Sequence, residues 1–488
     1  MSEFNFDVAL GATTTGAVGE NAVAELQKAL TAGYGTDVAA LTGGSALRVQ
    51  SLDKTMKSTI QENKHFVLFN ELAKSGAGAT VDEWTERTDV GGFPGGTTNS
   101  ETGVIAAANG NYKRRVGLVK YLMTRAEVSL VSTLGQNIES SKAVEAQAAA
   151  LRLLTDAEYL SFEGDASVVA TEFDGISAQM AAGVADGSVD VGNIVNADGG
   201  SLASINSINA GAAQISAYGN WGQASHLFIS QNVQADLDNG LDPSFRVALD
   251  NVGDGGMKLG TPVIGIRTSH GNIMTKNDTF IFDESRQAPF QTLFAAVATA
   301  NTALKPTLAL AAATGTAANK FTALRAGNYY YLVAGVSAAG QSDGVISAQT
   351  AIAAGQKCTL TITRSAGAGE TGYAIYRSRQ NGTDTPSDFR LIKRVACAGA
   401  TTTFVDENLD IPGSTKAFML PMGPGADAIS WRQLLPMMEF QLYPTNAPVL
   451  PWAQLLFGYL RMTKRRRVVV IKNIVPSGSL WRPFVAGA

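Results

Sequence analysis

Hydrophobic and polar positions follow two different spacings along this chain, and each spacing predicts a different kind of element. Residues 136–163 contain neither Gly nor Pro and are rich in Ala, Leu, Glu and Gln. Gly and Pro disfavour helix interiors, so the run predicts one helix, about 40 Å long at about 1.5 Å per residue. It ends at Gly164 and Asp165, a short distance before Asp174 and Gly175.

Ahead of this helix, a period of two predicts a long β-hairpin. Residues 80–90 have strand character around Trp84, residues 112–131 alternate from Val116 to Leu130, and residues 91–111 form a Gly-rich tip. An isolated two-stranded ribbon is marginal in water, so we expect the hairpin to lie on another subunit. The alternative is two strands of an ordinary sheet. The first limb is acidic and the second is basic, at Asp82, Glu83, Glu86 and Asp89 against Lys113, Arg114, Arg115, Lys120 and Arg125.

The segments outside this region predict an arm, an α/β region and a strand-rich insert. Residues 1–50 read as an arm with one helix at 21–30, and a second helix is expected at 52–72. The α/β region at 175–300 has expected helices at 202–218 and 232–239 and expected strands at 226–230, 262–266 and 280–282.

Residues 302–414 contain five strand signals between Gly-rich turns and no apparent helix, which favours a β-sandwich of immunoglobulin size inserted into a loop. The tail, residues 417–488, has apolar runs, a basic turn at 464–467 and a buried strand at 468–471. The five expected strands of the insert are residues 328–337, 358–364, 372–377, 389–395 and 402–405.

Composition narrows the class of protein. Apolar residues make up 45% of the 488 positions and charged residues 16%, which excludes bulk disorder. The net charge of -4 argues against a dedicated nucleic-acid binder. Cys358 and Cys397 alone exclude a disulfide-rich scaffold or a Cys-based zinc cluster; we expect two buried free thiols, although the pair could lie across a sandwich core. No signal peptide or apolar run of membrane-spanning length is visible, which predicts a soluble cytoplasmic chain.

No constellation in the sequence predicts catalysis, cofactor binding or metal binding. His65, His226 and His270 lie far apart and are expected to be structural. Asp165 and Asp174 fit turn roles. The basic run at 464–467 is expected to make an intersubunit contact rather than to bind nucleic acid. A formal dinucleotide fingerprint at Gly367, Gly369 and Gly372 precedes a strand instead of a helix, so it is rejected.

The order of these parts resembles the major capsid proteins of tailed bacteriophages, with the HK97-like α+β fold. The resemblance rests on the arm, the charged hairpin, the long helix ending in Phe162-Glu163-Gly164-Asp165, the Phe173-Asp174-Gly175-Ile176 segment and the α/β region. It implies an N-terminal arm at 1–75, an extended hairpin loop at 76–131, a peripheral domain with the spine helix at 132–175 and 415–488, an axial domain at 176–301 and the insert at 302–414.

The insert resembles immunoglobulin-like or fibronectin-type-III modules at residues 327–333, 372–377 and 403–406, although the Tyr-rich strand comes earlier than is usual. Phage capsid proteins often display such modules on the outer shell. Some family members crosslink a lysine to an asparagine, but no motif around Lys113 or Lys120 marks that reaction.

These features predict a structural protein, not an enzyme, that assembles into hexamers and pentamers of an icosahedral phage head around double-stranded DNA. The implied partners are other copies of the chain, portal, scaffold and decoration proteins, and DNA bound without sequence specificity. No membrane partner or cofactor is implied. Assembly in the bacterial cytoplasm and a final place in the virion are expected. The alternatives are an encapsulin-like compartment and a carbohydrate-binding surface adhesin.

Overall fold

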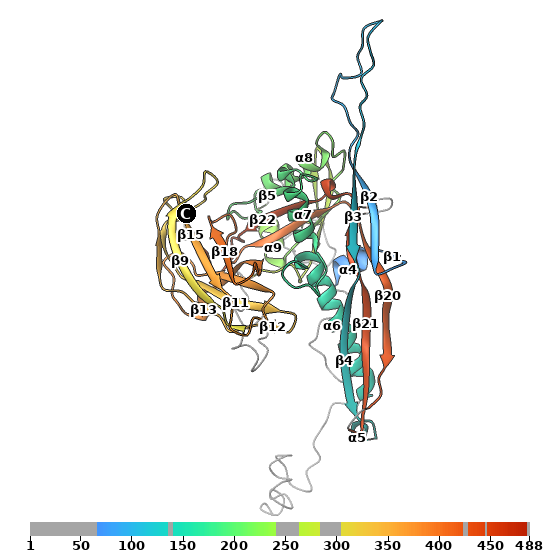
Figure 1. Cartoon of the computed structure of the whole chain (residues 1–488), viewed down its shortest axis with the longest axis vertical. Coiled ribbons are helices and arrows are strands. Elements are labelled where there is room, and N and C mark those ends of the chain that lie inside the picture. The colour runs from blue at the N-terminus through green and yellow to red at the C-terminus, as the bar shows by residue number, and fades with distance from the viewer. Residues whose placement is uncertain are drawn as a thin grey trace, which may run out of the picture. The chain divides into compact units, whose positions relative to one another are not determined.

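The computed structural model describes residues 66–134, 140–240, 263–283, 304–422, 428–444 and 447–485, which form a mixed α+β fold (Figure 1). Two compact units divide the chain, Met1–Ile60 with Gln136–Ser140 and Gln61–Gly135 with Ser141–Ala488. The elements described below belong to the second unit. The expected arm and the helix at 21–30 lie outside the described residues, as does most of the helix at 52–72. The described part of that range contains one short helix, α4, Val67–Glu71, which begins after Phe66.

The predicted long helix is confirmed as α6, Ser141–Glu163. One face of α6 packs Leu153, Ala157 and Phe162 into a core that it shares with Trp431 and Leu456 of a four-stranded sheet. The sheet has the order β1-β20-β21-β4, with β1 parallel to β20 and the other pairs antiparallel. Its strands are β1 Ala73–Gly76, β20 Ile429–Gln441, β21 Val449–Met462 and β4 Lys120–Ser129, and the short helix α5 Leu130–Leu134 follows β4.

Two glycines explain how the chain turns at the end of α6. A Cβ on Gly164 would lie 2.3 Å from the carbonyl oxygen of Phe173, and one on Gly175 would lie 2.4 Å from that of Leu160. Gly175 N donates to Gly164 O at 2.9 Å. Only residues without a side chain allow the loop after the helix to return this closely, which gives the Gly-Asp and Asp-Gly signatures a structural reason.

The predicted hairpin is present, but its second limb is two strands rather than one. β2, Val81–Asp89, pairs with β3, Asn111–Leu118, and Val119 then separates β3 from β4, which pairs with β21. Val119 is buried, and its N–H donates to Thr80 O at 2.9 Å. The expectation of one continuous strand over 112–131 is therefore wrong, because the strand leaves the ribbon at Val119 and enters another sheet with its faces reversed.

The α/β region is built on a six-stranded sheet of order β5-β22-β19-β6-β8-β7. The expected strand at 280–282 is wrong: the strand in this region is β8, Gly271–Asn277, and the chain turns after it because Asp278 Oδ1 accepts the N–H of Phe280 at 2.8 Å. The other strands are β5 Ile194–Asn196, β22 Val469–Ile474, β19 Thr415–Leu420, β6 His226–Ile229 and β7 Gly265–Thr268. The helical elements here are α7 Ile176–Ala185, η2 Val191–Asn193, α8 Asn206–Ser216 and α9 Gln231–Gly240.

The sheet shows how the tail returns to this region. β19 and β22 come from the tail, and they lie between β5 and β6. Their apolar residues Met419 and Ile471 share a core with Leu227 of β6 and Ile215 of α8. The helices expected at 202–218 and 232–239 and the strand at 226–230 are confirmed as α8, α9 and β6, with shifted ends.

The insert contains two sheets around one core, which we call the sandwich, and a separate antiparallel pair formed by β10 and β14. One sheet has the order β12-β11-β16-β17, with β13 paired to β11, and the other has the order β18-β15-β9. Tyr331, Val333 and Ile375 of the first sheet share a core with Leu360 and Ile362 of the second. The bounds are β9 Thr307–Thr314, β10 Gly327–Tyr329, β11 Tyr331–Ser337, β12 Gly340–Gln341, β13 Val345–Ile346, β14 Thr350–Ile352, β15 Gln356–Thr363, β16 Gly372–Arg377, η5 Pro386–Asp388, β17 Arg390–Ala396 and β18 Thr401–Asp406.

All five strands expected in the sandwich occur, with the first divided at Tyr330. β9 was missed in the Ala/Thr-rich run, and η5 is a single helical turn where no helix was expected. Gly372 is the first residue of the strand β16. A strand and not a helix therefore follows the three glycines, as expected when the dinucleotide fingerprint was rejected. Both cysteines are free; Cys358 is buried as expected, but Cys397 is only half-buried. Burial raises the pKa of the Cys358 thiol to about 12.

A buried ion pair holds the two sheets of the sandwich together. Arg377 of β16 is fully buried, and its Nη1 donates to Asp406 Oδ2 of β18 at 2.6 Å. Arg377 Nη2 donates to Asn408 Oδ1 at 2.6 Å, and Tyr331 Oη donates to the same carboxylate at 2.8 Å. The guanidinium also lies over the ring of Tyr329. A buried charge is tolerated when it is paired and hydrogen-bonded in this way.

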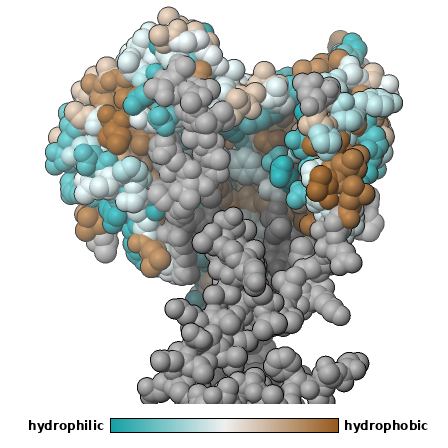
Figure 2. Space-filling model, turned by 90° about the horizontal axis from the view of Figure 1, so that it is seen from below, coloured by the Kyte–Doolittle hydropathy of each residue, from teal (hydrophilic) through white to brown (hydrophobic). Residues whose placement is uncertain are grey.

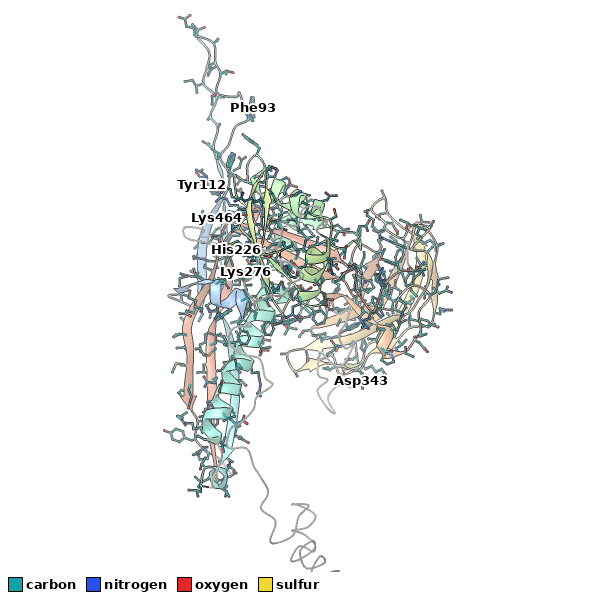
Figure 3. The ribbon with its side chains drawn as sticks, turned by 180° about the vertical axis from the view of Figure 1, so that it is seen from behind. Phe93, Tyr112, His226, Lys276, Asp343 and Lys464 are labelled. Atoms are coloured by element: carbon teal, nitrogen blue, oxygen red, sulfur yellow. The ribbon has the colours of Figure 1, made fainter. Side chains whose placement is uncertain are left out.

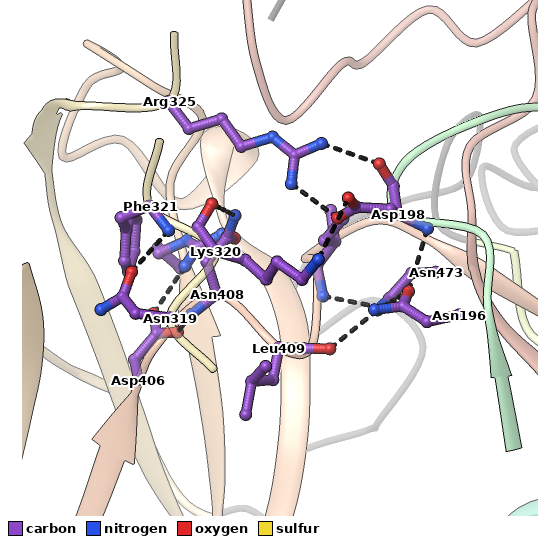
Figure 4. A network of polar contacts seen from close by, with 12 residues as sticks. Asn196, Asp198, Asn319, Lys320, Phe321, Arg325, Asp406, Asn408, Leu409 and Asn473 are labelled. Atoms are coloured by element: carbon purple, nitrogen blue, oxygen red, sulfur yellow. Dashed lines mark hydrogen bonds and ion pairs between the residues drawn. The ribbon is translucent and has the colours of Figure 1, made fainter. Parts of the chain in front are cut away.

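Two contacts fasten the sandwich to the α/β region and to the C-terminal segment. Arg325 donates to Asp198 Oδ1 at 2.8 Å and to its carbonyl oxygen at 2.7 Å (Figure 4). At the C-terminal side, Trp481 Nε1 donates to Asp388 Oδ1 at 3.1 Å, and Gln380 N donates to Pro483 O at 2.9 Å. The C-terminal segment therefore lies against the sandwich, as the label C in Figure 1 marks.

Candidate interaction surfaces

The β2–β3 hairpin pairs acidic and basic side chains as the sequence predicts. Arg114 forms an ion pair with Glu83, and Arg115 Nε donates to Glu86 Oε2 at 3.0 Å. In the strand register Val116 lies opposite Glu83, so Arg114 reaches Glu83 diagonally. Such diagonal cross-strand pairs contribute about 0.2–1 kcal/mol each, which aligns the ribbon but does not by itself stabilise it.

The base of the hairpin is fixed to the four-stranded sheet by Asp82. Arg432 Nε donates to Asp82 Oδ2 at 2.9 Å, and Tyr459 Oη donates to the same oxygen at 2.7 Å. Burial opposes ionisation, but these two hydrogen bonds and the charge of Arg432 hold the pKa of Asp82 below its usual value. Gly117 lies on the ring of Tyr459, where a Cβ would come within 2.3 Å. Asp82, Gly117, Arg432 and Tyr459 form what we call the hairpin anchor.

A second set of contacts fixes the middle of the hairpin to the end of α7. Arg115 Nη1 donates to Asp186 Oδ2 at 2.5 Å, and Lys113 Nζ donates to Asp186 O at 2.9 Å. Burial opposes ionisation here as well, but hydrogen bonds from Arg115 and Ser188 hold the pKa of Asp186 well below its usual value. The base and the middle of the ribbon are thus both held by contacts with other elements, and Lys113 is held by its own chain.

The tip of the hairpin, residues 90–110, is different. Phe93 is 74% exposed, Val104 is 92% exposed and Ile105 is 85% exposed. Every backbone hydrogen bond described within the tip is local, such as Gly96 N to Phe93 O at 2.9 Å. Figure 3 places Phe93 on the extended ribbon, away from the labelled His226 of the six-stranded sheet. Large apolar side chains gathered on a projecting loop mark a contact surface for a partner.

The four-stranded sheet presents a second apolar surface on the face opposite α6. Strand register places Tyr121 beside Phe457 and Met123 beside Leu455, and Leu455 in turn lies beside Met438 of the next strand. The Tyr121 and Phe457 rings meet edge to face, with centroids 4.9 Å apart. Met123 is 62% exposed. Figure 1 draws the four-stranded sheet at the right of the molecule, and Figure 2, seen from below, shows hydrophobic side chains in brown on that side as well as on the left. We call this surface the outer sheet face.

The basic turn expected at 464–467 contains the 3-10 helix η6, Arg465–Arg467. Arg466 Nε donates to Ser188 O at 2.8 Å and Arg467 Nε donates to Asn220 O at 3.2 Å, while Arg465 is buried. These hydrogen bonds lie within the chain, where they join the turn to the region after α7 and α8. An intersubunit contact of the basic turn stays a prediction. Figure 3 labels Lys464, the first residue of the turn.

The histidines and aspartates weighed as chemical groups have structural partners. His226 Nδ1 is 3.0 Å from Ser225 Oγ, and His270 Nδ1 is 2.8 Å from Ser216 Oγ, whereas His65 lies outside the described residues. Asp165 Oδ1 accepts the N–H of Ser167 at 2.8 Å. Asp174 Oδ1 accepts the N–H of Ala166 at 2.9 Å, so the turn roles expected for both aspartates are confirmed.

The described ranges contain neither a metal-binding cluster nor a membrane-spanning helix. Within the described part of the chain, no group of three or more His, Cys, Asp or Glu side chains is placed to hold a metal ion. No helix of the described ranges has the length and apolar character needed to cross a membrane.

Sequence reasoning did not find the residues of the hairpin anchor. Asp82 and Arg432 are 350 positions apart, and nothing local marks them as partners.

Comparison with known proteins identifies relatives over nearly the whole chain, although no family model matches it. The major capsid proteins of Staphylococcus phages S25-3 and K are each 26% identical over 469 residues, covering 92% of this chain and 95% of theirs. The putative major capsid protein of Enterococcus phage phiEF24C is 26% identical over 477 residues, with 92% and 94% covered.

Solved structures give weaker likenesses. The capsid of a native GTA particle has a TM-score of 0.45 at 9% identity, covering 90% of this chain and 100% of that one. The SrpI encapsulin complex of Synechococcus elongatus PCC 7942 has a TM-score of 0.41 at 8% identity, covering 87% and 94%. Likeness at this level supports no conclusion about fold or function. The sequence relatives confirm the predicted resemblance: this chain is similar to phage major capsid proteins over 92% of its length.

Proposed function

We propose that this chain is the major capsid protein of a tailed phage, and that many copies assemble as hexamers and pentamers into an icosahedral head around double-stranded DNA. The observation that carries the proposal is the similarity to phage major capsid proteins over 92% of the chain. A structural role agrees with those relatives, whose names indicate no catalytic activity.

We assign the parts of the chain to an HK97-like arrangement. The hairpin would be the extended loop of residues 76–131, α6 the spine of the peripheral domain at 132–175 and 415–488, and residues 176–301 the axial domain after an arm at 1–75. The sheet order supports one refinement: β19 and β22 lie between β5 and β6, so these two tail strands belong with the axial domain.

The hairpin supports assembly through its division into a fixed base and an exposed tip. The hairpin anchor sets the direction of the ribbon, and the tip carries Phe93, Val104 and Ile105 in solvent. On a neighbouring copy, the outer sheet face offers apolar side chains of the same kind. Many such contacts, each weak, become collectively strong in a closed shell because every copy is held at several places at once.

The remaining partners follow from the proposed role. We propose that the sandwich is an immunoglobulin-like module that projects outward and takes decoration proteins, and that portal and scaffold proteins join the shell in the host cytoplasm. DNA would be enclosed without sequence-specific binding, which the net charge of -4 supports. Two sheets around one core support the module.

Electron microscopy of the purified full chain, combined with light scattering, tests the proposal. The expected result is closed particles tens of nanometres across, with packaged nucleic acid in particles recovered from infected cells. Particles that enclose protein cargo and no DNA would indicate an encapsulin-like compartment instead. A chain that stays monomeric at high concentration and binds glycans would contradict assembly and favour an adhesin.

A further inference from the structure

A buried carboxylate holds the first described helix in place. Glu158, in the middle of α6, is fully buried, and its two oxygens accept the N–H groups of Leu68 and Phe69 at 2.7 Å each. Both amides belong to the first turn of α4, where N–H groups have no partner within a helix. The carboxyl group of α6 therefore joins α4, and the chain that leads into it at Phe66, to the core.

A second carboxyl group meets the first. Asp278 follows β8 and is fully buried. Its Oδ1 accepts the N–H of Phe280, but its Oδ2 receives no hydrogen bond from any N–H or hydroxyl of the described residues. The ring of Phe280 stacks on Phe66 with centroids 5.2 Å apart, which closes the site on that side. The carboxyl groups of Glu158 and Asp278 lie close enough for each to shift the pKa of the other, and the N–H of Leu68, which donates to Glu158, also faces Asp278.

The charged groups on the surrounding elements do not neutralise this pair. Glu71 of α4 and Lys276 of β8 form an ion pair with each other at 2.7 Å. Lys74 of β1 lies over the ring of Phe69 at 4.7 Å. His226 of β6, labelled near Lys276 in Figure 3, is half-buried, and burial lowers its pKa, so it is neutral at pH 7. Among the described residues, therefore, none of these side chains supplies a cation that faces the two buried carboxyl groups.

Such a site retains a proton. Two carboxylates in contact cannot both ionise in a low-dielectric environment, because burial and mutual repulsion both favour the protonated form. Burial, with the hydrogen bond and charge of Asp278, raises the pKa of Glu158 to about 9, and burial also raises the pKa of Asp278. At neutral pH the pair thus holds one proton between its two members.

We propose that Glu158 and Asp278 form a proton-binding latch, which fastens α4 to α6 and β8 and opens when the shared proton leaves. With the proton in place, the carboxyl of Glu158 supplies the hydrogen bond that Asp278 Oδ2 lacks. Without it, two buried negative charges repel each other, and the two amide hydrogen bonds that hold α4 separate.

The direction of the pH dependence follows from the raised pKa of Glu158. A carboxyl group with a folded pKa above its unfolded value of 4.5 stabilises the closed latch fully below pH 4.5, and this contribution is lost as pH rises through the folded value of about 9. Acid and neutral conditions therefore keep α4 fastened to α6, and alkaline conditions release it. The latch does not depend on the proposed assembly.

Hydrogen exchange of the Leu68 and Phe69 amides in the full-length chain tests the latch, with Phe228 of β6 as a reference for global opening. The protection factors of the two amides are expected to fall by up to about tenfold per pH unit between pH 6 and 9, relative to Phe228, and then to level off. The variant Glu158→Gln keeps one of the two acceptor oxygens and has no titrating charge at this position, so its profile should start from lower protection and be much flatter than that of wild type.

Two further variants keep the test decisive. In Asp278→Asn, the carboxyl group of Glu158 has no like charge beside it, so the fall in the protection factors should end at a lower pH. This variant provides the test if Glu158→Gln does not fold. Glu163→Gln, the same change later on α6 at a half-exposed position, should follow the wild-type profile. A wild-type profile that matches Phe228 throughout, or a Glu158→Gln profile as steep as wild type, would overturn the proposal.

Discussion

The β2–β3 hairpin and the sandwich are both antiparallel strand pairings, but they are stabilised in different ways. The sandwich encloses its own apolar core and a buried Arg377–Asp406 ion pair. The hairpin encloses nothing; its base depends on Asp82 and Arg115 reaching residues of other elements, and its tip is exposed. Strand pairing alone therefore does not show whether a region is stable by itself. A strand pairing is stable without a partner only when its side chains are buried against other parts of the same region.

The largest effect is expected from removing one member of the buried ion pair of the sandwich. Arg377→Met leaves Asp406 charged, buried and without its strongest partner, which should lower the free energy of unfolding of the sandwich by about 3–5 kcal/mol. Urea-dependent hydrogen exchange of β11 and β16 amides measures it. Lys393→Ala, an exposed position on the neighbouring strand β17, should leave the value unchanged. Equal losses in the two variants would contradict the stabilising role of the pair.

The second-largest loss of stability is expected from adding a side chain at Gly117 in the hairpin anchor. Gly117→Ala places a methyl group 2.3 Å from the ring of Tyr459, so the ring or the ribbon must shift, at a cost of about 1–3 kcal/mol. Gly78→Ala is the matched control, because a Cβ there meets nothing within 4 Å. Thermal unfolding of both variants gives the comparison. A Gly117→Ala variant as stable as Gly78→Ala would show that the ribbon is not held at this point.

The charge at the hairpin anchor gives a pH-dependent prediction. Because the folded pKa of Asp82 is lowered, its contribution is present above the unfolded value of 3.8 and is lost as pH falls below that value. Asp82→Asn should weaken the anchor by about 1–2 kcal/mol at pH 7 and flatten the acid response. Hydrogen exchange of β2 and β3 amides reports both effects, and sandwich amides should not change. Asp89→Asn, exposed at the end of the same strand, is the control.

A smaller effect is expected where the sandwich meets the α/β region. Arg325→Ala removes the contact with Asp198, but that carboxylate is 43% exposed, so solvent screening limits the loss to about 1 kcal/mol or less. Exchange at Gly199 should rise severalfold while β11 is unaffected. Lys320→Ala removes a longer ion pair to the same carboxylate, 3.7 Å apart, and should do less. A loss that spreads into the sandwich core would mean that the sandwich is not self-sufficient.

The smallest effect on the fold, and the sharpest contrast with the sandwich, is expected at the hairpin tip. Phe93→Ser changes a side chain that is 74% exposed, so the unfolding free energy of the unassembled chain should stay within about 0.5 kcal/mol. The yield of assembled particles should fall, because the tip loses apolar contact area. Sedimentation of assembly mixtures measures the yield, and Thr98→Ser serves as the control. Unchanged assembly would remove the tip from the proposed interface.

Sequence reasoning succeeded where a local signal decides the structure. The long helix was visible because no Gly or Pro interrupts it, and β16 because its alternation is bounded by turns. The break at Val119 was not visible: Val116, Leu118 and Leu122 keep the same period of two across it, although the first two are exposed and the third packs into the core. Only the tertiary pairing of β4 with β21 reverses the faces.

The sequence contains one signal for the latch that the sequence analysis did not use, namely the position of Glu158. Glu158 lies four residues after Leu154 and four before Phe162, so it falls on the apolar stripe of α6, where a charged residue is anomalous. That position alone marks Glu158 for attention. Its partner Asp278 could not be found the same way, because the expected strand at 280–282 concealed the turn that carries it.

The contact of the C-terminal segment with the sandwich has a practical consequence for engineering. Trp481 and Pro483 contact Asp388 and Gln380, so a peptide or reporter joined to this C-terminal segment would be attached on the side of the sandwich rather than of the hairpin. Cargo attached there would share the orientation of that module, while the tip that we propose for subunit contact would stay unobstructed.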